Sequence, residues 1–432
     1  MFLYLLITLL VLLYYVITRK YNYWKDRKVP HKPPTFLLGN YGDMYLQKKS
    51  LGEILQDYCN EFPNEKFIGA FQATEPVLIP KDPEIIKLIV TKDFASFNGR
   101  LISDHIHKEP ASSNLFSTYG DSWRVLRQNM SPLFSSAKMK NMFHLIDKCA
   151  HRFEEMLDRE TQISNFLEVR EYKHSGRNDF VDLVMSWKTS KQIVGDSIPN
   201  SKTREVKKVS LEATDNLLVA QCIVFFAAGF ETSSTTLGYT LYEIAKSEEI
   251  QKRVLEEVDS YLARHDNKVN FDCISDLPYL DAVIDETLRY YPVLGMIPRE
   301  LMEDYTMPDG TKLDKGMRVH VPVYYLHHNP EFYPEPEVFR PERFLREEKK
   351  KINPYVYLPF GEGPRFCIGM RFAKMQMMTG LITILKKYRL ELADGMPKKL
   401  KFRALSGITR SIDGIMLKFI EREGWEKRVF AK

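Results

Sequence analysis

The longest apolar stretch of the chain lies at its start. Residues 2–17 (FLYLLITLLVLLYYVI) contain no charged side chain. As a helix they would span about 24 Å, because each residue adds about 1.5 Å. That length approaches the apolar core of a thin bilayer, roughly 27 Å. The pattern therefore predicts a helix that enters a membrane.

The residues around this stretch distinguish a retained membrane anchor from a cleaved signal peptide. No basic residue precedes it and no small-x-small cleavage site follows it, which argues against a cleaved signal peptide. The basic residues that follow it would keep the rest of the chain on the cytoplasmic side; they are Arg19, Lys20, Lys25, Arg27 and Lys28. Residues 30–34 (PHKPP) cannot continue a helix. We expect an anchor over 1–20, a basic, proline-containing hinge over 21–34, and one domain over 35–432.

The remaining pattern is mostly helical. Helical periodicity is predicted for residues 83–90, 122–130, 138–157, 211–246, 247–263, 276–290 and 367–387. Short strands are predicted for residues 77–79, 319–323 and 415–419. Residues 217–230 (LLVAQCIVFFAAGF) are apolar nearly all round, as in a helix buried on every side. The predicted fold class is mainly α with small β-sheets.

Composition removes several classes of function. A net charge of +5 with no basic, aromatic-interleaved run gives no sign of nucleic-acid binding. The five cysteines are scattered and form no CxxC pair, so neither a disulfide framework nor a zinc ribbon is indicated.

One cysteine stands in a distinctive setting, residues 360–369 (FGEGPRFCIG). A thiolate ligand needs a glycine-containing loop, the positive end of a following helix and apolar cover. Gly363 and Gly369 would free the loop, and Phe360 would cover the sulfur of Cys367. Arg365 carries a charge that suits an anionic partner. A lone cysteine is usually a small buried hydrophobe, but here five positions of the pattern F-x-x-G-x-R-x-C-x-G are matched.

This loop resembles that of the cytochrome P-450 superfamily, of the microsomal type, and the chain is most similar to insect family-six enzymes that oxidise xenobiotics. The resemblance implies the cytochrome P-450 fold and haem b, with Cys367 as the axial ligand of its iron. It also implies a monooxygenase that inserts one oxygen atom of dioxygen into lipophilic substrates.

Two further segments carry the resemblance on the side of this loop. Glu286 and Arg289 match the family's E-x-x-R, and at i and i+3 they share one helix face. Arg343, in PERF (341–344), matches a third partner. The resemblance implies a buried structural network behind the cysteine loop, held by guanidinium–carboxylate geometry.

The segment AGFETS (228–233) matches the family's A-G-x-[D/E]-T-[S/T]. Gly229 would leave room for dioxygen, and the Thr232 hydroxyl can bond the carbonyl of Ala228 and open the helix locally. Glu231 and Thr232 would relay protons, which is general-acid work. An acid inside so apolar a helix is costly unless it is used or paired.

Other matches concern the haem and the substrate. The resemblance assigns haem contacts to the side chains Trp123, Arg127, Arg100, Arg299 and Arg365, with Phe360 and Gly369 from the loop. It assigns the substrate pocket to Ala227, Phe230, Leu294, Ile297 and Ile408, a mostly bulky, apolar set that suits lipophilic compounds.

The family also implies partners and a location. The electron donor is an NADPH-dependent flavoprotein reductase, with cytochrome b5 as a second candidate, and the location is the endoplasmic reticulum membrane with the catalytic domain in the cytoplasm. Candidates for the basic docking face are Arg124, Arg371, Lys374, Lys138 and Lys140.

The chain departs from the family in one region. Gly229 lies only 102 positions after Arg127, and the family fits more helices there. Most of helix E and helices F and G, which roof the substrate pocket, are expected to be missing at a gap near 171–177. A second hypothesis is therefore an inactive haem-binding isoform or an incomplete gene product. A third, a haem enzyme that uses no dioxygen, is disfavoured by the Glu231–Thr232 pair.

Overall fold

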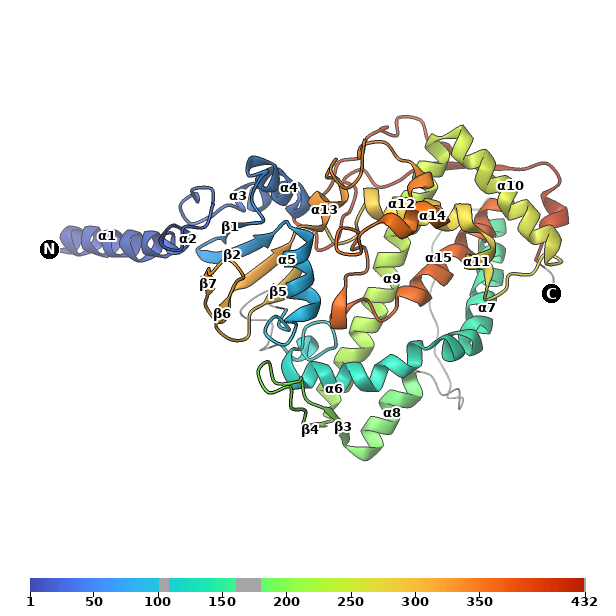
Figure 1. Ribbon diagram of the computed structural model, residues 1–432. Coiled ribbons are helices and arrows are strands. Elements are labelled where there is room, and N and C mark those ends of the chain that lie inside the picture. Colours follow the sequence, from blue (N-terminus) through green and yellow to red (C-terminus); the bar gives the residue numbers. More distant parts are fainter. Residues whose placement is uncertain (101–108, 161–179, 431–432) are drawn as a thin grey trace.

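The computed structural model describes residues 1–100, 109–160 and 180–430. The body is mainly helical and contains four small sheets. A long apolar helix projects from the sheet-containing end, and most of the other long helices gather at the opposite end (Figure 1). The expected fold class is therefore observed in this part of the chain.

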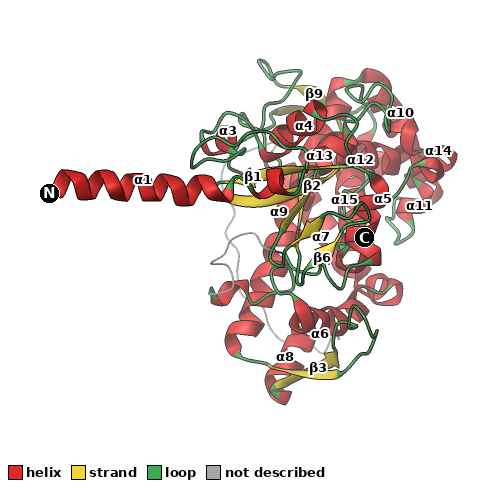
Figure 2. Ribbon diagram, turned by 60° about the vertical axis from the view of Figure 1, so that its left-hand side comes forward, coloured by secondary structure: helices red, strands yellow, loops and turns green. Residues whose placement is uncertain are grey.

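The projecting helix is α1 (Phe2–Lys20), none of whose residues is buried. Helix α2 (Tyr23–Asp26) follows almost directly, and Figure 2 shows α1 projecting away from the body. In the segment expected as a hinge, Trp24 is fully buried. The segment is thus packed on the body rather than free.

The largest sheet has the strand order β1 (Phe67–Gln72), β2 (Glu75–Pro80), β8 (Arg318–Val321) and β5 (Ile297–Glu300). β2 and β8 are parallel, and the other two pairings are antiparallel. Leu78, Ile79, Val319 and Val321 are fully buried in its core. This core supports the chain just before the cysteine loop, since Leu358 belongs to it.

The helical half is built around α9 (Asp215–Lys246). Its C-terminal half packs with α10 (Glu248–Arg264), α12 (Pro278–Tyr290) and α15 (Met370–Leu385), and α7 (Ser136–Glu160) packs on α15 and shares the same apolar core. Helix α6 (Gly120–Met130) packs with the hairpin β3–β4. The remaining elements of the described residues are α3 (Gly42–Tyr45), α4 (Leu51–Glu61), α5 (Pro83–Lys87), α8 (Phe180–Ser190), β3 (Gln192–Asp196), β4 (Lys208–Glu212), α11 (Cys273–Asp276), β6 (Tyr305–Thr306), β7 (Lys312–Leu313), α13 (Val323–His327), α14 (Arg346–Lys351), β9 (Tyr388–Leu392), β10 (Leu417–Glu421) and six short 3-10 or π turns.

Two predictions about α9 are wrong. The helix starts at Asp215, not at Leu211, because Leu211 pairs with Ile193 in the β3–β4 hairpin and the Thr214 side chain caps the helix. Nor is it buried on every side. Phe226 and Phe230 are 77% and 67% exposed, because no described segment packs against that face. Helix α9, like α1, is long and apolar enough to cross a membrane by length and composition alone.

The expected gap near 171–177 lies outside the described residues. The positions of the sequence-predicted helices and strands elsewhere agree with the structure to within a few residues, apart from the start of α9 and a π-helical turn over 88–92 that continues α5.

Candidate functional site

The cysteine loop joins the sheet half to α15. The Cys367 N–H donates to the carbonyl of Phe360 at 2.8 Å, which closes the loop on itself. Helix α15 begins at Met370 with Gly369 as its N-cap residue, so Cys367 lies just ahead of the positive end of a 16-residue helix. The arrangement favours negative charge on the sulfur.

Glycine is required at two positions of this loop. Gly361 and Gly363 have φ angles of +71° and +73°, the left-handed region that glycine adopts without strain. A Cβ at Gly363 would also lie 1.8 Å from the carbonyl oxygen of Val90. Gly369 was expected to free the loop in the same way, but it has an ordinary φ and space for a side chain. Its contribution is instead a backbone hydrogen bond toward the thiol of Cys367.

Two opposing effects act on the pKa of the Cys367 thiol. Water can reach the side chain, yet dense surrounding protein raises the pKa of the thiol. The Gly369 N–H and the charges of Arg127 and Arg100 act in the opposite direction and lower that pKa. Without further stabilisation burial prevails, so the thiolate needs a cation to bind.

The predicted Glu–Arg–Arg network is present and buried. Arg289 forms a fork with Glu286, from Nε to Oε2 at 2.7 Å and from Nη2 to Oε1 at 2.8 Å. Both side chains are fully buried. Arg343 Nε lies 3.6 Å from Glu286 Oε1, and the backbone N–H of Arg340 donates to the same oxygen at 2.8 Å.

His327 connects this network to the cysteine loop. Arg289 donates to the His327 carbonyl at 2.8 Å, and the ring Nδ1 lies 3.2 Å from the Arg289 carbonyl. The ring Nε2 accepts from the Leu358 N–H at 2.9 Å, two residues before Phe360. Burial holds the pKa of His327 well below its usual range, so the ring is neutral and can accept this bond. No local sequence signal pointed to His327.

Four arginines gather beside the cysteine loop. Arg299 and Arg365 are buried, and Arg100 and Arg127 are partly buried. Arg365 lies over the ring of Trp123 at 4.6 Å, and Arg127 over the ring of Phe366 at 4.7 Å. These residues come from α6, β5, the cysteine loop and the turn after Asn98, so only the fold brings them together.

The arginines repel one another. Burial lowers the pKa of Arg100 to about 10 and that of Arg299 to about 9. Burial also holds the pKa of Arg365 well below its usual value, and the charges of the neighbouring arginines lower it further. The Nε atoms of Arg100, Arg299 and Arg365 have no hydrogen-bond partner, and among the residues the structure describes no carboxylate pairs with these side chains. Such a cluster calls for an anionic ligand with several acceptor oxygens. The two propionates of a haem fit this requirement, and a cysteine sulfur in the position of Cys367 is chemically suited to bind the haem iron.

Helix α9 presents the predicted proton-relay residues. The Thr232 hydroxyl donates to the Ala228 carbonyl at 2.6 Å, although the helix stays continuous there. Around Gly229 there is open space within 4 Å of an added Cβ. Ala227 and Phe230 are exposed, and at about 100° per residue Phe230 lies on nearly the opposite side of the helix from Ala228 and Thr232.

Glu231 has a partner that the sequence did not reveal. Arg410 donates to its carboxylate from the C-terminal loop. That loop is well held, because Thr409 donates from its N–H to Val293 at 2.8 Å and from its hydroxyl to Pro292 at 2.5 Å. Tyr239 of α9 also donates to the Thr409 carbonyl at 3.0 Å. Of the expected pocket residues, Ile408, Leu294 and Ile297 lie on or next to these segments.

The candidates for a basic docking face differ in their surroundings. Lys374 pairs with Asp281 and Asp285 at 2.7 Å and is mostly buried, so it is part of the interior support of α15. Arg371 and Lys140 are exposed, whereas Arg124 and Lys138 are partly buried. Arg371 donates to the hydroxyl of Ser136 at 2.5 Å.

Comparison with known proteins agrees with this geometry. The sequence profile of the family Cytochrome P450 matches residues 29–174 and 168–419. The chain is 31% identical over 498 residues to Cytochrome P450 6B2 of Helicoverpa armigera, covering 96% of this chain and 97% of that protein. It is 32% identical over 496 residues to Cytochrome P450 6B4 of Papilio glaucus, covering 96% and 98%. It is 32% identical over 499 residues to Cytochrome P450 6j1 of Blattella germanica, covering 94% and 96%.

Proposed function

This chain belongs to the cytochrome P450 family, and from that premise we propose that it is a membrane-anchored haem-thiolate monooxygenase of lipophilic compounds. Membership of the family implies a haem monooxygenase. The observation that carries the proposal is the juxtaposition of Cys367, on its glycine-shaped loop, with four arginines that lack an anionic partner among the described residues. We infer that Arg100, Arg127, Arg299 and Arg365 hold the haem propionates.

When bound, the haem iron supplies the activation of dioxygen. The chain's own residues have separate tasks. Cys367 would bind the metal and push electron density toward it. The Glu286–Arg289–Arg343 network would hold the loop in place through His327. Thr232 and Glu231 would move protons toward the reacting oxygen.

The other components of the proposal follow the family and the anchor. Helix α1 would hold the protein in the endoplasmic reticulum membrane with its body in the cytoplasm. An NADPH-dependent flavoprotein reductase would supply electrons, with cytochrome b5 as a second donor. Arg371 and Lys140 are the exposed members of the expected docking set. Leu294, Ile297 and Ile408 would contact a lipophilic substrate.

A specific observation favours the second candidate, a haem-binding form without turnover. The alignment with Cytochrome P450 6B2 runs over 498 positions, more than the 432 residues of the chain, and the family match is divided where residues 168–174 fall in both parts. Four apolar side chains spaced as on one face of α9 are more than half exposed; they are Val219, Ile223, Phe226 and Phe230. We infer that the segment which covers this face in the family, including helices F and G, is missing.

Turnover separates the two candidates. The full chain is reconstituted with a P450 reductase in phosphatidylcholine vesicles and given NADPH and a lipophilic alkoxycoumarin, with a Cys367→Ala variant as control. A monooxygenase forms dealkylated product, and the variant does not. A protein that binds haem stoichiometrically, consumes NADPH and forms no product supports the inactive form, since an open pocket does not exclude water.

A further inference from the structure

One face of the N-terminal half of α9 forms an apolar stripe. Its members are Val219, Ile223, Phe226 and Phe230, which are 55%, 51%, 77% and 67% exposed. At about 100° per residue, these four side chains fall within a sector of about 60° around the helix. Thr232 lies on the opposite side of α9. The stripe is therefore separate from the face that carries this proposed proton-relay residue.

The spacing within the stripe is that of a helix–helix seam. Successive members are four, three and four residues apart, which is the spacing of the a and d positions in a coiled coil. The exposed residues that flank the stripe, Cys222 on one side and Ala227 on the other, are small. Small flanking side chains let a second helix approach closely. The stripe thus has the form of one half of a helix pair, and no helix in the described part of the chain supplies the other half.

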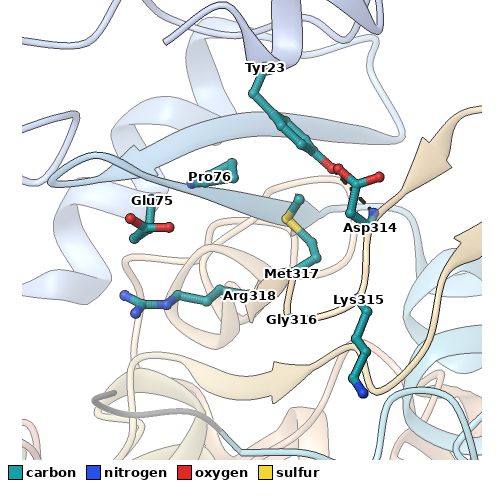
Figure 3. A pocket seen from close by; sticks show the side chains of 8 residues that line it. All are labelled: Tyr23, Glu75, Pro76, Asp314, Lys315, Gly316, Met317 and Arg318. Atoms are coloured by element: carbon teal, nitrogen blue, oxygen red, sulfur yellow. Dashed lines mark hydrogen bonds between the residues drawn. The ribbon is translucent and has the colours of Figure 1, made fainter. Parts of the chain in front are cut away.

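The stripe is a helix surface and not a pocket. Small-molecule sites are concave, like the cavity in Figure 3, which lies in the sheet half and is lined by Tyr23, Asp314 and Arg318 among others. The stripe, by contrast, consists of neighbouring side chains that project from a single helix. Its partner should therefore have an extended apolar surface, as a second helix or a bilayer does.

The charges of α9 favour a second helix over a bilayer. A helix that lies on a membrane surface is typically rich in lysine and arginine beside its apolar face. From Asp215 to Tyr242, α9 contains no basic residue, and its charged side chains in this span are Asp215 and Glu231. These acids stand at the two ends of the stripe, where an anionic membrane surface would repel them.

A second copy of the chain provides a helix of matching shape. Two α9 helices can pack antiparallel about a twofold axis between positions 223 and 226. Ile223 of one copy then faces Phe226 of the other, and Val219 faces Phe230. Each contact sets an aliphatic side chain against an aromatic one, so the seam has an even width. A parallel pair would set like against like and would also align the two helix dipoles unfavourably.

The charged ends of the stripe suit the same arrangement. The side chain of Asp215 is 81% exposed, in a loose pair with Lys188 at 3.6 Å. Arg410, the partner of Glu231, has a side chain that is 53% exposed. In the antiparallel register, Asp215 of one copy lies opposite position 234 of the other, about 4.5 Å along the helix from Glu231. An acidic and a basic side chain therefore come close at each end of the pair.

We propose that α9 is a dimer interface, in which the stripes of two copies pack antiparallel and shield each other from water. At roughly 200 Å² for each aromatic side chain, the exposed parts of Phe226 and Phe230 would cover about 300 Å² per copy. A standard interface covers roughly 800 Å² per partner, so the pair is reversible and each copy folds alone. The pairing needs no haem, and its failure would leave the proposed monooxygenase function standing.

Cross-linking of the full chain in phosphatidylcholine vesicles tests the pairing. The background carries Cys149→Ser and Cys222→Ser, because both of these cysteines are exposed. Copies with Val219→Cys and copies with Phe230→Cys are reconstituted together and treated with a short bismaleimide. We expect at least about five times more cross-linked dimer than from either variant alone, since like positions would be about 16 Å apart along the seam. Val194→Cys mixed with Phe230→Cys is the matched control, because Val194 is 56% exposed on the β3–β4 hairpin.

A charge placed in the stripe gives a second measurement. Ile223→Lys in both cross-linking partners should reduce the dimer at least about tenfold, because it buries an unpaired charge in the seam. Val194→Lys, outside the stripe, should leave the amount of dimer unchanged. Circular dichroism like that of the parent shows that each variant is folded. Cross-linking that survives Ile223→Lys would overturn the proposal.

Three other outcomes also overturn it. Equal cross-linking by the mixture and by each variant alone would mean a parallel pair or random collision. Absent cross-linking, with a Phe226→Trp reporter quenched by brominated phosphatidylcholine, would mean that the bilayer covers the stripe. Absent cross-linking, with that reporter shielded from both brominated lipid and aqueous iodide, would mean that another part of the same chain covers it.

Discussion

Arg410 of the C-terminal loop pairs with Glu231 in the middle of α9. This contact joins the acid proposed to move protons to a loop that carries Ile408, a proposed pocket residue. Both partners are about half exposed, so the pair contributes at most about 1 kcal/mol to stability. Its effect should therefore be on the position of the carboxylate rather than on folding.

We predict that Arg410→Gln lowers the yield of product per NADPH consumed while changing the free energy of unfolding by under about 1 kcal/mol. A carboxylate without its partner is less well oriented. Arg410→Lys should restore much of the yield. In a Glu231→Gln background the Arg410→Gln change should have no additional effect. An equal effect in both backgrounds would mean that Arg410 acts on something other than Glu231.

The buried fork between Arg289 and Glu286 gives a prediction about stability. Arg289→Lys removes the fork and the bond to the His327 carbonyl, and leaves a buried carboxylate poorly paired. A loss of about 3–5 kcal/mol is expected, measured from urea unfolding. Haem retention should fall with it, because the Leu358 contact of His327 loosens. Arg264→Lys, at the exposed end of α10, is the matched control and should unfold like the parent.

Substitutions on the exposed face of α9 should leave the free energy of unfolding nearly unchanged. Phe226→Ser with Phe230→Ser removes two side chains that are already in solvent, so the free energy of unfolding should move by about 0.5 kcal/mol or less for each. Self-association in low detergent, followed by sedimentation velocity, should decrease. Val254→Ala, fully buried in the helical core, is the contrast and should destabilise. A double variant that unfolds readily would show that this face is covered.

Two buried histidines should make the stability of the folded protein depend on pH. Burial lowers the pKa of His328 to about 4 and that of His320 to about 3. The unfolded chain binds protons at these positions from about pH 6.5 downward, while the folded chain does not. Stability should therefore fall as the pH drops from about 6.5 to about 4, by up to about 1.4 kcal/mol per pH unit for each histidine.

The control for this effect is His320→Gln. The amide can still bond the Tyr41 hydroxyl, which lies 2.8 Å from His320 Nδ1, but it does not titrate. The slope of stability against pH over that range should shrink by about one bound proton. An unchanged slope would mean that His320 is protonated in the folded state.

The sequence predicted those features whose signals are local. The loop around Cys367 and the spacing of Glu286 and Arg289 each occupy one short segment, so their geometry follows from turn and helix rules. The role of Gly369 was predicted wrongly, because its φ angle depends on where α15 begins. Gly361 has the positive φ angle instead.

Contacts between residues far apart in the chain could not be predicted from the sequence. Arg410 and His327 act through residues 179 and 31 positions away, and nothing near them in sequence marks those contacts. The docking of Trp24 depends on Gly69 in another strand. Leu211 has a helical pattern but pairs with Ile193 in a hairpin, because strand pairing outweighs local periodicity.

The central claim is that Cys367 binds a haem iron as a thiolate in this short chain. Its most direct test is the absorption spectrum of the dithionite-reduced, CO-bound protein, expressed at full length with haem supplied. We predict the red-shifted Soret band of thiolate ligation for the parent and its loss in Cys367→Ala. A parent that binds haem without that band, or a Cys367→Ala variant that keeps it, would contradict the assignment.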